Sequence, residues 1–221
     1  MIRFRWPIVV DLDRPRRDKL DATLIAAAQR VQRLLPIDNV DVAIALGARS
    51  AIPEWAVGGF TPGPMQITLF LDPANPHFAD TAMPERLSST LAHELHHAQR
   101  MRGPGYGTTL GETLVTEGLA QQFEQETGHP VAFYSLALAG TALAQMAERA
   151  LHSLDELGYD HAAWFFGRTG DALYPRHGGY ALAYALVRNW LAASGTTAAA
   201  AVSIDANEVL QPWRSGALGV D

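Results

Sequence analysis

Residues 93–97, His-Glu-Leu-His-His, constrain this chain more than any other stretch, because they match the pattern H-E-x-x-H. On an α-helix, residues i and i+4 lie one above the other on the same face, so His93 and His97 can reach one metal ion. Glu94 would lie beside them, within reach of a metal-bound water. Zinc hydrolysis needs this arrangement. A shuffled chain of the same composition is expected to contain roughly 0.013 such matches, so the surrounding sequence has to decide.

The residues around the motif have the pattern of an amphipathic helix. Pro84 suits a first helical turn, and the Gly-Pro-Gly sequence at 103–105 ends the predicted helix. Apolar residues recur at helical spacing: Leu87, Leu91, Leu95 and Ala98. The leucines lie on the side opposite His93, so the helix can bury them and turn both histidines toward a cleft. The alternative is a surface helix with solvated histidines.

A third metal ligand is expected, because catalytic zinc usually has three protein ligands and one water. Glu117 is the best candidate, and it lies in a second predicted helix about twenty residues after the motif. This helix should begin near Thr109, which has capping-box spacing with Glu112. Gly118 would let the helix approach the first helix closely. The alternative for a glutamate here is solvation, which we expect for Glu112 and Glu124.

Several segments resemble a known group of enzymes. An H-E-x-x-H motif followed about twenty residues later by a helical glutamate is similar to the gluzincin branch of the zinc metallopeptidases. More narrowly, residues 55–195 resemble the family of predicted zinc-dependent proteases catalogued as DUF2268, in LAHELHHAQR, TEGLAQQFE and PRHGGYALAYALVRNWLA. The resemblance implies zinc ligands His93, His97 and Glu117, with Glu94 as general base. Gluzincins often carry an Asp one turn after the third ligand, where this chain has Gln121.

Peptide hydrolysis also needs a hydrogen-bond donor for the oxyanion, and residues 175–180 are the best candidate segment. Two glycines permit close backbone approach there, and His177 and Tyr180 bracket them. Packing on a helix face is the alternative for Tyr180. His96 is expected near the rim of the cleft. It is either a neighbour of the metal ligands or itself a ligand in place of one of those assigned. The remaining histidines look isolated, and no role is predicted for them: His77, His129, His152 and His161.

The order of expected elements indicates an α+β fold. Residues 41–46 and 65–71 alternate between apolar and polar side chains and are predicted strands. After residue 84 almost everything is predicted to be helical, so a small antiparallel or mixed N-terminal sheet precedes a mostly helical body. Residues 65–71 are either an edge strand beside the zinc-binding helix, to which an extended substrate adds, or an internal strand.

Other segments give local predictions. Residues 19–35 form an amphipathic pattern that predicts a helix. Gly58-Gly59 and the Pro-Gly-Pro sequence at 62–64 are read as turns. The longest apolar run, residues 131–144, is too short for a membrane span and predicts a core helix. A single domain over residues 1–221 is expected, with a possible lobe boundary near 127–130.

The composition narrows the classes of partner that this chain is expected to bind. The net charge is −6, and no basic tract is long enough to suggest nucleic acid. The chain has no cysteine, which excludes disulfides and thiolate metal sites and fits a reducing compartment. The apolar run at residues 8–10 is too short for a signal peptide. We therefore expect a soluble cytoplasmic protein that binds Zn²⁺ and a peptide or protein substrate, with no nucleic-acid or membrane partner. The sequence contains no signal for an oligomeric state.

The leading hypothesis is a zinc-dependent metallopeptidase. A second hypothesis is a metal-binding, non-catalytic peptide-binding or chaperone-like module that keeps the metal site. The presence of Glu94 argues against it, because metal binding alone requires no base at that position. A third hypothesis is a zinc hydrolase that acts on a non-peptide amide.

Overall fold

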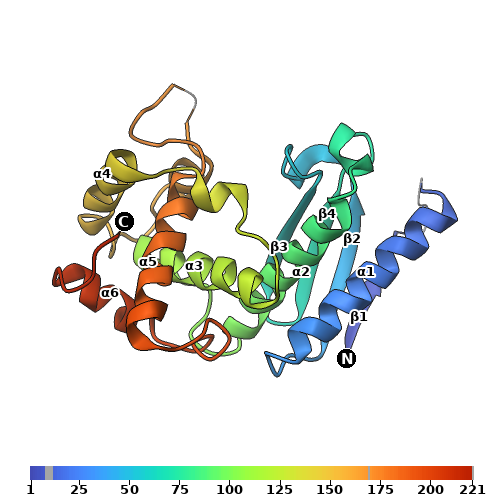
Figure 1. Cartoon of the computed structure of the whole chain (residues 1–221), viewed down its shortest axis with the longest axis horizontal. Coiled ribbons are helices and arrows are strands. Elements are labelled where there is room, and N and C mark those ends of the chain that lie inside the picture. The colour runs from blue at the N-terminus through green and yellow to red at the C-terminus, as the bar shows by residue number, and fades with distance from the viewer. Residues whose placement is uncertain (8–11, 169, 221) are drawn as a thin grey trace. The chain divides into compact units, whose positions relative to one another are not determined.

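A four-stranded sheet and two long helices form the first of two units in the computed structural model, which describes residues 1–7, 12–168 and 170–220 (Figure 1). This unit contains Met1–Arg102 and the short return segment Thr127–His129. The second unit contains Gly103–Glu126 and Pro130–Asp221. The apolar run at residues 8–10 lies outside the described residues.

The sheet is mixed, which is one of the two alternatives that the sequence leaves open. Its strands are β1 (Ile2–Arg5), β2 (Val40–Leu46), β3 (Val57–Gly63) and β4 (Gln66–Leu71). Their order is β1-β2-β4-β3, with β1, β2 and β4 parallel and β3 antiparallel to β4. The strand predicted at 65–71 is therefore internal, which excludes the edge-strand alternative for it. The edge strands are β1 and β3, and β3 packs against the helix that carries the motif.

The turn prediction for Gly58-Gly59 is wrong, because both residues lie within β3. The turn signal at residues 62–64 is borne out in part, because the turn between β3 and β4 lies at Pro64 and Met65. Gly58 and Gly59 reflect close packing instead of turns, and neither has a positive φ. A Cβ at Gly58 would collide with the backbone of Ser50, in the short helical turn η1 (Ala48–Ser50). A Cβ at Gly59 would lie 2.5 Å from Glu94. Pro62 fits an edge strand, where its missing N–H breaks no ladder.

Helices α1 (Arg14–Gln32) and α2 (Met83–Arg100) pack side by side against the sheet (Figure 1). The Asp13 carboxylate caps α1 by accepting a 2.8 Å hydrogen bond from the Arg16 N–H. Pro84 lies in the first turn of α2, as predicted. The apolar stripe of α2 is fully buried: Leu87, Leu91, Leu95 and Ala98. The turn η2 (Pro76–Ala79) precedes α2.

The second unit is helical throughout its described elements. They are α3 (Leu110–Glu126), η3 (Phe133–Leu136), α4 (Gly140–Leu151), η4 (Ala162–Phe166), α5 (Gly178–Ser194) and α6 (Ala206–Arg214). The capping box at the start of α3 is confirmed. The Glu112 N–H donates to the Thr109 hydroxyl at 3.2 Å, and the Thr109 N–H donates to the Glu112 carboxylate at 3.0 Å.

Helices α3 and α5 form the closest helix pair of this unit. A Cβ on Gly118 would collide with the Ala183 carbonyl oxygen and the Val187 side chain, both in α5. The glycine therefore permits close packing of α3 on α5. The prediction that Gly118 serves the approach of α3 to the motif helix is wrong.

The prediction of a core helix at residues 131–144 is also wrong. The run is divided between η3 and the first turn of α4, with Gly140 at a φ of 52° at the start of the second helix. The left-handed conformation of this glycine changes the chain direction between the two elements. Among the described residues, no helix is long and apolar enough to cross a membrane.

Candidate metal centre

His93 and His97 lie together on α2, on the side away from its leucine stripe. Their ring centroids are 4.5 Å apart, with the ring planes at 89°. Both side chains are buried, with 8% and 4% of their surface exposed. The spacing of four residues therefore brings two imidazoles together, as the motif predicts. Neutral imidazole nitrogens are good ligands for zinc.

Glu94 faces the edge strand β3. The Thr61 hydroxyl donates to the Glu94 carboxylate over 2.5 Å, and it also lies 3.1 Å from the Glu94 carbonyl oxygen. Both residues are buried. The carboxylate next to His93 is thus held in a defined position by a neighbouring strand.

Glu117 is a buried residue of α3, with 3% of its surface exposed. The Tyr106 hydroxyl donates a hydrogen bond to its carboxylate. Burial raises the pKa of Tyr106 well above its ordinary value, and the nearby charge of Glu117 raises it further. The Thr116 hydroxyl donates to the Tyr106 carbonyl oxygen at 2.8 Å, which fixes the loop that carries this tyrosine.

His93, His97 and Glu117 form a group of potential metal ligands. Each offers one ligand atom, and these atoms all lie within 4.8 Å of one another. Two imidazole nitrogens and a carboxylate oxygen are a donor set that zinc commonly takes, leaving a fourth position open. A buried carboxylate also needs a compensating partner, which a cation supplies. The residues present therefore fit a zinc ion.

Comparison with protein families agrees with the donor set. The model of the family described as predicted Zn-dependent protease (DUF2268) matches residues 20–211. The chain belongs to this family. The match contains the motif, Glu117 and the segment around Tyr180. No curated protein and no solved structure shows significant similarity to the chain. Membership of DUF2268 confirms the resemblance seen in the sequence.

The family resemblance assigns no role to Tyr180. This residue lies in a cluster of aromatic rings. Its ring centroid is 5.1 Å from that of Phe165, 5.2 Å from Tyr134 and 6.2 Å from His177. His177 precedes α5 with a φ of 60°, an uncommon conformation for a residue with a side chain. The structure brings Tyr180 and His177 together. A catalytic role for either residue stays a prediction.

Two other acidic residues of α3, Glu112 and Glu124, differ in their surroundings. Glu112 accepts hydrogen bonds from the backbone N–H groups of Thr108 and Thr109, which lower its pKa below the ordinary value. Glu124 is buried and accepts a 3.2 Å hydrogen bond from the Tyr134 hydroxyl. The expectation that Glu124 is solvated is wrong, because its position on α3 turns it into the packed interior.

Four histidines also differ from the sequence-based expectation. His77 is not isolated, because its Nδ1 lies 3.0 Å from the Asp80 carboxylate. His96 is fully buried and does not lie at an exposed rim. His129 is not isolated, because its Nε2 lies 3.1 Å from the Ser88 hydroxyl. His161 is not isolated either, because its Nδ1 lies 3.0 Å from the Tyr159 hydroxyl. Burial lowers the pKa of His161, and the charge of Glu117 opposes that shift.

Sequence reasoning missed Tyr106 and Thr61. Tyr106 lies between Gly105 and Gly107, whose φ angles are 92° and 108°, and such a loop has no periodicity that would predict its contacts. Thr61 lies between the two sequences read as turns, Gly58-Gly59 and residues 62–64. A strand prediction there would have placed Thr61 and Gly59 on one face, as alternate residues.

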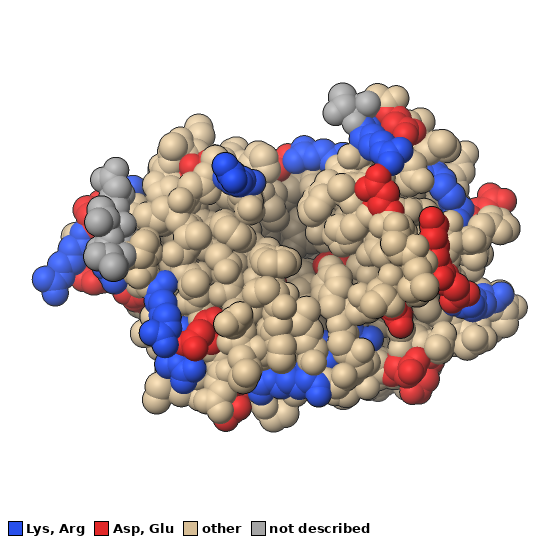
Figure 2. All heavy atoms as spheres, turned by 180° about the vertical axis from the view of Figure 1, so that it is seen from behind, with Lys and Arg blue, Asp and Glu red and all other residues tan. Residues whose placement is uncertain are grey.

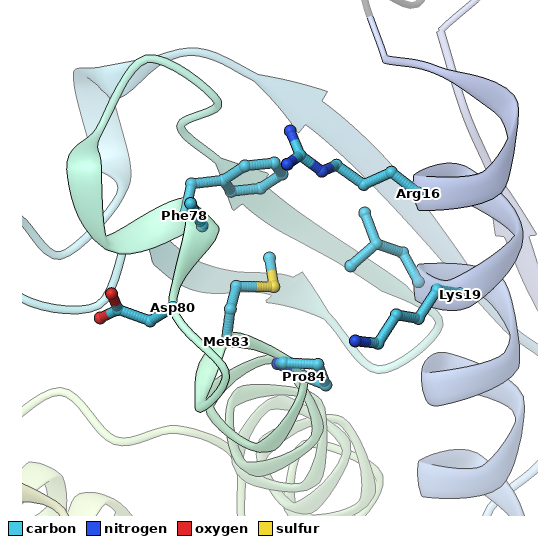
Figure 3. Close-up of a pocket in the computed structure, with 8 residues that line it drawn as sticks. Arg16, Lys19, Phe78, Asp80, Met83 and Pro84 are labelled. Atoms are coloured by element: carbon cyan, nitrogen blue, oxygen red, sulfur yellow. The ribbon is translucent and has the colours of Figure 1, made fainter.

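A separate pocket of about 130 Å³ lies between α1, η2 and the start of α2 (Figure 3). Arg16 and Lys19 reach from α1 toward Phe78 and Met83, while Asp80 points away. Pro84, at this pocket, is nine residues before His93, about 13 Å along the helix. The pocket is therefore distinct from the candidate metal centre.

Charged side chains of both signs are interspersed over the face drawn in Figure 2. Lys and Arg form no continuous field on that face.

Proposed function

We propose that the chain is a zinc-dependent metallopeptidase that hydrolyses peptide bonds. The observation that carries the proposal is the buried group of His93, His97 and Glu117, whose ligand atoms lie within 4.8 Å of one another. A zinc ion bound there would act as a Lewis acid and lower the pKa of a water molecule. Membership of a family of predicted Zn-dependent proteases supports the same activity.

Glu94 is the general base in this proposal. Its carboxylate takes a proton from the attacking water and passes that proton to the leaving amine nitrogen. Two features support the role. Glu94 directly follows His93, and its carboxylate is held against β3 by Thr61. A base in a fixed position needs no reorganisation before it accepts the proton.

The edge strand β3 supports a peptide as the substrate. It pairs with β4 on one side only, and Glu94 packs against its inner face. An extended peptide can add to such an edge through main-chain hydrogen bonds. Tyr180 and His177 are proposed as the donors that stabilise the oxyanion, because a phenol and an imidazole both carry suitable N–H or O–H groups.

Two further proposals concern the whole chain. We propose that both units belong to one domain spanning residues 1–221, because the chain passes between them more than once, at 102–103, 126–127 and 129–130. We also propose a cytoplasmic location, which the absence of cysteine supports.

The proposed activity is tested by screening the purified protein against a peptide library with and without a metal chelator. Cleavage that the chelator abolishes is expected. The variant Glu94→Gln should retain zinc and lose activity by about 10²–10⁴-fold, since an amide cannot accept the proton from water. No chelator-sensitive cleavage of any peptide would favour the non-catalytic binding module, and cleavage of other amides alone would favour a non-peptide hydrolase.

A further inference from the structure

Two alternate residues of β3, Gly59 and Thr61, face the Glu94 side chain of α2. Residues i and i+2 of a strand lie on the same face, so both can contact one side chain of the packed helix. All three residues are in the same unit. Phe60, between them, is exposed and belongs to the opposite face of the strand.

Thr61 contacts Glu94 at two points. Its hydroxyl oxygen lies 2.5 Å from Oε2 and 3.1 Å from the backbone carbonyl oxygen of Glu94. A threonine hydroxyl has one hydrogen, so the shorter contact, to the carboxylate, receives it. Thr61 and Glu94 are each only 6% exposed, so bulk water competes poorly for this bond. A hydrogen bond to an ionised carboxylate is stronger than one between neutral groups.

Gly59 provides the space that the carboxylate occupies. A Cβ at this position would lie 2.5 Å from both Cγ and Oε1 of Glu94, and 2.7 Å from Cδ. The backbone of Gly59 has no positive φ, so its conformation does not require glycine. The contact with Glu94 is therefore the reason that a side chain is excluded here. Thr61 restrains Oε2, and the Gly59 backbone lies against the side of the carboxylate that carries Oε1.

We propose that Thr61 is a positioning residue for Glu94, and that Gly59 leaves the room this position requires. The inference rests on the proposed function, in which Glu94 is the general base. A glutamate side chain has three rotatable bonds, so its carboxylate can point in many directions when no neighbouring group restrains it. The hydroxyl of Thr61 selects one of these directions for the carboxylate.

Thr61→Val removes the hydroxyl and keeps the shape of the side chain, so it is the principal variant. It should lower kcat by about 10- to 100-fold, the usual effect of losing such an orienting partner, while KM and zinc content stay near the wild-type values. Thr61→Ser restores the hydroxyl and should recover most of kcat. Thr68→Val is the matched control, because Thr68 of β4 pairs with Phe60 and lies on the face away from α2.

Gly59→Ala should also lower kcat, because its methyl group displaces the carboxylate. A fall in kcat for Thr61→Val that Thr61→Ser does not share supports the proposal. Equal kcat values for wild type and Thr61→Val, with Glu94→Gln inactive, would overturn it and leave the proposed function intact.

A second readout needs no activity and no metal. Unfolding midpoints of the metal-free protein are measured for wild type, Thr61→Val, Glu94→Ala and the double variant. The two single effects should be non-additive, with the double variant more stable than their sum predicts, because each removes the same hydrogen bond. Additive effects would overturn the proposal even in an active enzyme. If the effects are non-additive but the protein cleaves no peptide, the contact between Thr61 and Glu94 is confirmed and the proposed function is rejected.

Discussion

Tyr106 and Glu117 are two residues on which the candidate metal site depends. The Tyr106 hydroxyl donates to the buried carboxylate of Glu117, which also belongs to the group of potential metal ligands. A partner of this kind orients the ligand before the metal binds. Because the two residues are eleven positions apart and joined through a glycine-flanked loop, no spacing in the sequence reveals their contact.

Tyr106→Phe is expected to weaken zinc binding by about 10–100-fold, since the ring is kept and only the orienting hydroxyl is lost. Competition titration with a chromogenic zinc chelator measures this change. Tyr174→Phe, in the same unit, is the control, because the Tyr174 ring packs against Trp164, and it should bind zinc like the wild type. Equal affinity for wild type and Tyr106→Phe would show that the hydroxyl does not orient the ligand.

Tyr180→Phe tests the proposed oxyanion donor. If the hydroxyl stabilises the oxyanion, this variant should lower kcat by about 10²-fold with little change in KM or zinc content. The phenyl ring remains, so the aromatic contacts with Phe165 and Tyr134 should persist. If Tyr180 only packs, the substitution should be nearly silent, and His177→Ala should carry the catalytic loss instead.

The elements differ in how far the sequence predicts them. Helix α2 and the capping box of α3 are predicted because their signals lie within one turn of the chain. Strand β3 is not predicted, because its glycines are required by contacts with residues distant in sequence, Ser50 and Glu94. The division of residues 131–144 has a different cause, since Gly140 has a φ of 52° and a Cβ there would meet no other residue closely, and its left-handed conformation interrupts a continuous apolar run.

Gly118→Ala tests the packing of α3 on α5. Alanine favours a helix, yet its methyl group would collide with the Ala183 carbonyl oxygen and the Val187 side chain. We expect a net loss of about 1–3 kcal/mol in the free energy of unfolding, as for other overpacked sites. Urea unfolding measures it. Gly63→Ala is the control, because a Cβ there meets nothing within 4 Å, and it should be nearly neutral. A Gly118→Ala variant as stable as the wild type would contradict the close packing.

At the scale of the whole molecule, the sequence identifies the candidate metal ligands better than it identifies the residues that surround them. A motif of five residues and one later glutamate suffice to nominate His93, His97 and Glu117, and the three ligand atoms do lie near one another. The residues that hold Glu94 and Glu117 come from a strand and a loop. Their positions depend on how the chain packs, which no local pattern encodes.

Zinc content per chain is the most direct test of the account. Elemental analysis of the purified protein should find close to one zinc per chain, and His93→Ala, His97→Ala and Glu117→Gln should each lose most of it. Glu112→Gln, on the same helix as Glu117, is the control and should keep its zinc. Wild-type protein that takes up no zinc, or a Glu117→Gln variant that keeps full occupancy, would contradict the metal centre proposed for this chain.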